Sequence, residues 1–133
     1  MVTTLPEPYS EITRRYFETA PNAGILQGLG VGSGSAGAPA TGTWVRFDVQ
    51  ILQQHVTAAR FLAFGCPHVI AIASWLTENS VGRVAQERLP ETVHALQRRF
   101  EVPAEKLGRL LVIEDAWIYA IRAAVTKSRA ALE

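Results

Sequence analysis

The stretch that most constrains the fold is a pair of strand-like segments joined by two residues. In "TWVRFDVQIL", residues 43–52, apolar and polar side chains alternate, and a period of two is typical of a strand with one buried face. "HVTAARFLAF", residues 55–64, follows directly after Gln53 and Gln54 and is strand-like again. Two such segments with a two-residue connection predict an antiparallel hairpin. The side chains expected on the buried face of its first strand are Val45, Phe47, Val49 and Ile51.

Helices are predicted on both sides of this hairpin. Ser10 can cap a helix whose apolar side chains Ile12, Tyr16 and Phe17 share one face, and "APNAG", residues 20–24, interrupts it. Gly65 ends the second strand, and Pro67 fits the first turn of an apolar helix over residues 68–79.

Two more helices are predicted towards the C-terminus. One begins at Pro90 and continues to Phe100, and the segment 101–108 after it is expected to be a loop. A long terminal helix follows, in which Ile113, Trp117, Ala120 and Ala124 recur at helical spacing. The order of helix, antiparallel strands and several helices predicts the α+β class. We expect one domain over residues 1–133, with residues 1–8 as a loose arm.

The glycine-rich segment "GLGVGSGSAGAPATG", residues 28–42, is predicted to be a loop, because it has few apolar side chains to place in a core. Its glycines resemble those of phosphate-binding loops. However, no strand precedes it, and neither a P-loop lysine nor a βαβ unit follows it. We therefore do not expect nucleotide binding.

Charge and hydropathy exclude several classes of partner. The 133 residues include 13 basic and 12 acidic side chains, a net charge of +1, which argues against nucleic acid and anionic membranes as partners. No apolar run reaches the ~18 residues of a membrane span. The N-terminus also lacks the basic start and apolar core of a signal peptide. These features predict a cytoplasmic protein.

Cys66 is the only cysteine, so one chain can form neither an internal disulfide nor a four-thiolate metal site. At a helix N-terminus its thiolate would be favoured, as for a nucleophile or a metal ligand. A buried apolar filler is an equally good reading. His68 is expected to be an ordinary helix-start residue, because residues two apart on a helix point in different directions. His55 and His94 are assigned no role.

Four segments, in this order, resemble motifs of the iron–sulfur cluster assembly scaffold family of the IscU and NifU N-terminal type. They are "YSEITRRYFETAPNAGIL", "VGSGSAGAPATGT", "ARFLAFGCPHVIAIASWLTE" and "VIEDAWIYAI". The resemblance extends from about Tyr9 into the terminal helix. It implies an α+β fold with a small three-stranded antiparallel sheet, helices packed against the sheet and a long C-terminal helix.

The resemblance also implies where a site would lie and how it has changed. The family's cluster site consists of three cysteines and an aspartate, often with a histidine nearby. The positions that correspond to it here are Thr41, Thr43, Cys66, Gly108 and Arg109. The family's chaperone-recognition loop is reduced to "VPAEK", in which Pro103 and Lys106 remain. If the family geometry holds, Arg109 either stabilises a Cys66 thiolate or extends from the domain edge into solvent.

These changes imply a scaffold-like protein with a degenerate site. It would bind or modulate a cysteine desulfurase or another assembly protein, without enzymatic activity and without building a cluster. No cofactor is expected on the monomer. Three alternatives stay open: a persulfide carrier through Cys66, an iron–sulfur, iron or zinc site shared between subunits of a homo-oligomer, and a module that binds a small anion at the same end.

Overall fold

The computed structural model describes residues 9–132, so the arm predicted at residues 1–8 lies outside the described residues. In chain order the elements are α1 (Glu11–Thr19), β1 (Val31–Ala38), the 3₁₀ turn η1 (Pro39–Thr41), β2 (Thr43–Leu52), β3 (His55–Phe64), α2 (Pro67–Ser80), α3 (Val93–Phe100), the 3₁₀ turn η2 (Ala104–Lys106) and α4 (Leu107–Leu132). The predicted α+β fold is confirmed. Among these residues, no helix has the length and apolar character needed to cross a membrane.

The sheet is antiparallel, with strand order β1-β2-β3. The predicted hairpin is confirmed, because β2 pairs with β3 and only Gln53 and Gln54 connect them. Both of these residues have positive φ, 52° and 69°, as a tight two-residue turn requires. The four apolar side chains predicted to face inward from β2 are all buried.

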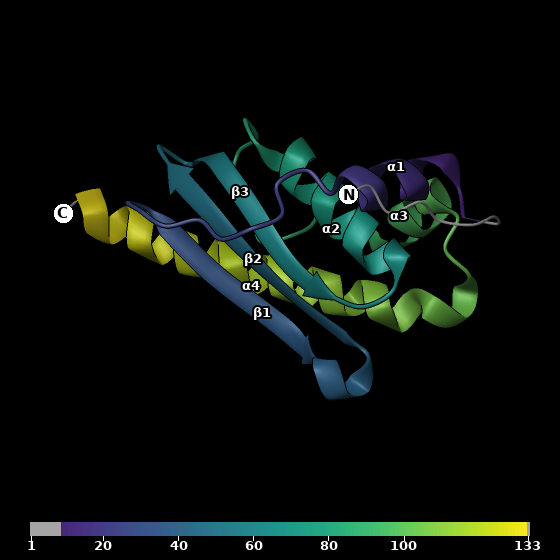
Figure 1. Cartoon of the computed structure of the whole chain (residues 1–133). Coiled ribbons are helices and arrows are strands. Elements are labelled where there is room, and N and C mark those ends of the chain that lie inside the picture. Colours follow the sequence, from purple (N-terminus) through teal and green to yellow (C-terminus); the bar gives the residue numbers. More distant parts are fainter. Residues whose placement is uncertain (1–8, 133) are drawn as a thin grey trace.

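Helices α2 and α4 lie against one face of this sheet (Figure 1), and α1 and α3 pack on these two helices. The long helix α4 packs along β1 and β2, and α2 packs against β3. Between the two layers, Phe47 of β2 meets Trp117 of α4 edge to face, with 5.1 Å between the ring centroids. The chain between α1 and β1 crosses the other face, where the N–H of Leu26 donates to the Asp48 carboxylate at 3.0 Å.

The prediction of a loop over residues 28–42 was wrong, because β1 occupies Val31–Ala38 within it. β1 is stabilised by backbone hydrogen bonds to β2, and the apolar side chains that cover it belong to α4. A Cβ on Gly32 would overlap the backbone of Ala124, and one on Gly34 would lie 2.7 Å from the carbonyl oxygen of Ala116. The glycines therefore permit α4 to approach the strand backbone closely.

Two helix starts also differ from the prediction. α3 begins at Val93 and not at Pro90, because the Thr92 hydroxyl accepts the Ala95 N–H at 3.1 Å and caps the helix there. α4 begins at Leu107, so the expected loop over residues 101–108 is shorter. As a result, the helix begins before Arg109 and holds that residue in its first turn.

A pair of glycine substitutions tests this packing. Gly34→Ala should lower the free energy of unfolding by about 1–3 kcal/mol, because the added methyl group must displace the α4 backbone. Gly108→Ala should raise that free energy, by up to about 1 kcal/mol, because Gly108 lies in a helix and no atom lies within 4 Å of an added Cβ. Urea unfolding of both variants measures the difference, and equal effects would contradict the packing role of Gly34.

Candidate functional site

Cys66 lies at the point where β3 passes through Gly65 into α2. It is the N-cap residue of α2, with φ −75° and ψ 167°, and Pro67 follows in the first turn. The predicted position at a helix N-terminus is therefore confirmed. Figure 1 shows that α4 begins at the same end of the molecule. The Cys66 side chain is partly exposed and its sulfur is a free thiol.

The electrostatic surroundings of Cys66 favour the thiolate. Burial raises the pKa of the thiol, but polar neighbours outweigh this effect and lower the pKa from its ordinary value to about 6. The neighbours responsible are hydrogen-bond donors on His68, the Val69 backbone and Arg109, together with the positive charge of Lys106. Because this pKa lies below neutral pH, most molecules carry the thiolate at pH 7.

His68 takes part in these surroundings. It is only 5% exposed, and its Nδ1 lies 3.2 Å from Nζ of Lys106. Because an ammonium group only donates hydrogen bonds, Nδ1 is the acceptor and the ring proton is placed on Nε2. The Tyr9 ring packs beside His68, with 5.0 Å between the centroids, and Lys106 Nζ lies 5.9 Å from the Tyr9 centroid.

The expectation that His68 is an ordinary helix-start residue missed this arrangement. Residues two apart diverge on a regular helix, but Cys66 is the N-cap and its backbone is extended. The helical offset therefore does not apply between Cys66 and His68. Recognising Cys66 as the cap, from Gly65 before it and Pro67 after it, was the signal that could have linked the two side chains.

The other predicted positions differ in their surroundings. Arg109 hydrogen-bonds to Cys66 and lowers the pKa of its thiol, which corresponds to the first of the two roles considered for it. Thr43 is buried at the start of β2, beside Trp44, which pairs with Phe64 at the end of β3. The Thr41 hydroxyl is exposed and donates to the Ala38 carbonyl at 2.8 Å, so that bond turns it back onto its own loop. Gly108 and Pro103 are exposed.

Comparison with known proteins identifies the family. The family described as the NifU-like N terminal domain matches residues 8–130, almost the whole chain. The chain belongs to this family. The resemblance inferred from the four motifs is therefore confirmed, and it extends over the same range.

Characterised relatives support this membership. The iron–sulfur cluster assembly scaffold protein IscU of Azotobacter vinelandii is 33% identical over 119 residues, which cover 86% of this chain and 91% of that protein. The IscU scaffold protein of Escherichia coli K12 is 30% identical over 111 residues, 81% of this chain and 87% of that protein. The mitochondrial iron sulfur cluster assembly protein 1 of Debaryomyces hansenii is 31% identical over 118 residues, 86% of this chain and 66% of that protein. The cytoplasmic location of this chain stays a prediction.

Two solved structures share the fold. One is a NifU-like N-terminal protein from Brucella abortus, with TM-score 0.69, 18% identity, and coverage of 89% of this chain and 94% of that chain. The other is a putative iron–sulfur cluster assembly scaffold protein from Fervidobacterium islandicum, with TM-score 0.68, 14% identity, and coverage of 85% and 96%. At these identities the likeness concerns the fold alone.

In this NifU-like chain the side chains at the site do not fit an iron–sulfur cluster. Such a cluster is commonly held by four ligands, mostly thiolates. Among residues 9–132, no group of three or more His, Cys, Asp and Glu side chains could hold a metal ion. Two positive side chains, Lys106 and Arg109, lie beside the one thiol instead. They favour an anion on Cys66 and disfavour a metal cation there.

The pH dependence of alkylation tests the surroundings of Cys66. Since the thiolate is the nucleophile and the chain has a single thiol, the rate with iodoacetamide should reach half its maximum near pH 6. Arg109→Gln should move this midpoint to higher pH, because it removes a hydrogen-bond donor to the thiolate. Arg122→Gln is the matched control, since Arg122 lies further along α4 than Arg109 and pairs with Glu87 instead of Cys66. A wild-type midpoint at the free-cysteine value of ~8.5 would contradict the assignment.

Proposed function

We propose that this chain works in iron–sulfur cluster assembly as a protein that binds an assembly partner and accepts sulfur on Cys66, without building a cluster itself. The observation that supports the proposal best is a partly exposed thiol whose pKa is lowered to about 6. The sequence resemblance predicts that this thiol corresponds to a family cluster ligand. Membership of the family supports a role in iron–sulfur cluster assembly. The cations beside the thiol support a role other than holding a metal.

The proposed step is a sulfur transfer that needs no oxidant or reductant. The Cys66 thiolate attacks the terminal sulfur of a persulfide, R–S–SH, on a donor such as a cysteine desulfurase. A new S–S bond forms at Cys66, the S–S bond of the donor breaks, and the inner sulfur of the donor leaves as the thiolate R–S⁻. Arg109 and Lys106 then offset the negative charge of the persulfide on Cys66 after it loses its proton.

Exposed apolar side chains close to the site in sequence support a partner surface. Phe64, two residues before Cys66, is 53% exposed, and Leu111, two residues after Arg109, is 47% exposed. Contact with a partner would bury these two side chains and remove their apolar surface from water. A donor docked there would bring its persulfide to a thiol that is already ionised.

A second candidate is a partner-binding protein that takes no sulfur and only modulates the partner. The same exposed side chains favour it, and the state of Cys66 separates it from the first. Under this reading Cys66 is a structural residue, and the partner complex forms equally well without its thiol.

Intact mass after incubation with a cysteine desulfurase and cysteine, without oxygen, tests the proposal. Wild-type protein should gain the mass of one sulfur atom at Cys66, and Cys66→Ser should gain none. Iron and sulfide added to the wild-type monomer should give no cluster absorbance. The matched control is Arg98→Gln, which removes an exposed charge outside the site and should gain sulfur as the wild type does.

Three outcomes would change the assignment. A complex with the desulfurase on size-exclusion chromatography, without a mass gain, would favour the modulator. A stable cluster on the monomer would contradict both candidates. A cluster that appears only in a dimer would favour the site shared between subunits.

A further inference from the structure

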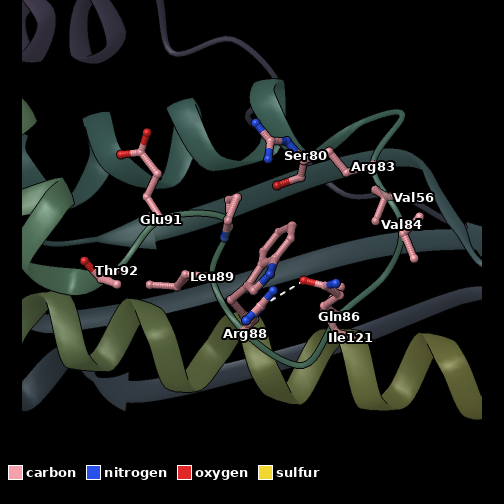
Figure 2. Close-up of a pocket in the computed structure, with 12 residues that line it drawn as sticks. Val56, Ser80, Arg83, Val84, Gln86, Arg88, Leu89, Glu91, Thr92 and Ile121 are labelled. Carbon is pink, nitrogen blue, oxygen red and sulfur yellow. Dashed lines mark hydrogen bonds between the residues drawn. The ribbon is translucent and has the colours of Figure 1, made fainter.

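A cavity of about 540 Å³ lies at the opposite end of α2 from Cys66, under the segment that connects α2 to α3 (Figure 2). α2 spans 14 residues, and at ~1.5 Å per residue its two ends are about 20 Å apart. The cavity is therefore separate from the thiol site. Its volume lies within the range of roughly 300–1,000 Å³ that is usual for small-molecule sites.

The segment over the cavity is tied down on both sides. Towards the sheet, the Val56 N–H donates to the Arg83 carbonyl at 2.9 Å, and the Gly82 N–H donates to the Val56 carbonyl at 2.8 Å. Towards α4, Arg122 pairs with Glu87 at 3.2 Å. The cavity is thus framed by anchored backbone and is formed before any ligand binds.

Ser80, the last residue of α2, supplies an unsatisfied polar group to this cavity. Its side chain is 2% exposed, and its Oγ is the one buried side-chain polar atom among residues 9–132 without a hydrogen-bond partner. The buried hydroxyl of Thr77, one turn earlier in α2, does have a partner, because it donates to the Ser74 carbonyl at 2.7 Å. Figure 2 shows the Ser80 side chain pointing in among the lining residues. A buried hydroxyl without a partner is costly, and it indicates that a partner outside the chain completes it.

The lining combines an apolar wall with uncompensated positive charge. The apolar wall includes Val56, Leu89, Trp117 and Ile121. Glu91 also lines the cavity, but its carboxylate is already bound by Arg99. Arg83 donates only to the Asn79 carbonyl at 2.9 Å, and Arg88 donates only to the Gln86 side chain at 2.8 Å. Within the described part of the chain, neither guanidinium pairs with a carboxylate.

We propose that this cavity binds a small amphipathic carboxylate, with its apolar body against the wall and its anionic group near Ser80 and Arg83, which lie together at the α2 side of the cavity (Figure 2). The carboxylate offsets the charge of the Arg83 guanidinium and accepts a hydrogen bond from the Ser80 hydroxyl. Arg88, on the side of the cavity towards α4, adds a second positive charge to the lining. A neutral apolar molecule would fill the wall but would offset neither charge, so carboxylate chemistry is the class that matches this lining.

Binding of octanoate, compared with 1-octanol as its neutral analogue, tests the class of ligand. Octanoate should give saturable amide shifts in an NMR titration, confined to residues around the cavity, with an affinity at least about tenfold above that of 1-octanol. Arg83→Gln combined with Arg88→Gln should remove this preference, because both substitutions are at exposed side chains that supply the charge. Arg98→Gln, the matched control, and Cys66→Ser should leave the affinity for octanoate unchanged.

Ser80→Ala tests the hydroxyl in two ways at once. It should weaken octanoate binding about fivefold, by loss of one hydrogen bond, and it should raise the Tm of the ligand-free protein, because it removes an unsatisfied buried group. A lower Tm with unchanged octanoate binding would mean that internal water satisfies the hydroxyl, which would overturn the proposal. Absence of saturable shifts, or equal affinity for octanoate and 1-octanol, would overturn it as well.

Discussion

The close contact between β1 and α4 is the constraint on which the rest of the structure depends. Because Gly32 and Gly34 carry no Cβ, the backbone of α4 lies directly on the strand, against Ala120 and Ala124. A helix held this closely has little freedom to slide or rotate. The contact therefore determines where both ends of a 26-residue helix lie, and with them the side chains that α4 presents.

Two separate regions depend on this placement of α4. Its first turn carries Arg109 to Cys66 at the end of β3, where the guanidinium helps to lower the pKa of the thiol. Further along, Trp117 and Ile121 form part of the cavity wall, and Arg122 pairs with Glu87 of the segment that covers the cavity. α2 joins the same two regions, with Cys66 as its N-cap and Ser80 as its last residue. The two helices thus place the Cys66 site at one end of α2 and the cavity at the other.

The sequence predicted the features that depend on local pattern. Alternation identified the hairpin of β2 and β3, and Gly65 and Pro67 placed Cys66 at a helix start. β1 was missed because its stability comes from backbone pairing and from α4, and neither contributes to a side-chain pattern within the strand. The approach of Lys106 to His68 joins residues 38 positions apart, so it depends on tertiary packing. The unsatisfied hydroxyl of Ser80 is likewise visible only when every neighbour is placed.

The charges around Cys66 connect the donor groups present at this site with the proposed sulfur chemistry. A cluster site brings several thiolates together, and bound iron offsets their mutual repulsion. At Cys66 there is a single thiolate, and the positive side chains of Arg109 and Lys106 compensate its charge. The same cations would repel iron from the thiolate, so one set of interactions both disfavours a cluster and lowers the pKa of the thiol. A single thiolate beside two cations is thus suited to act as a nucleophile rather than as a metal ligand.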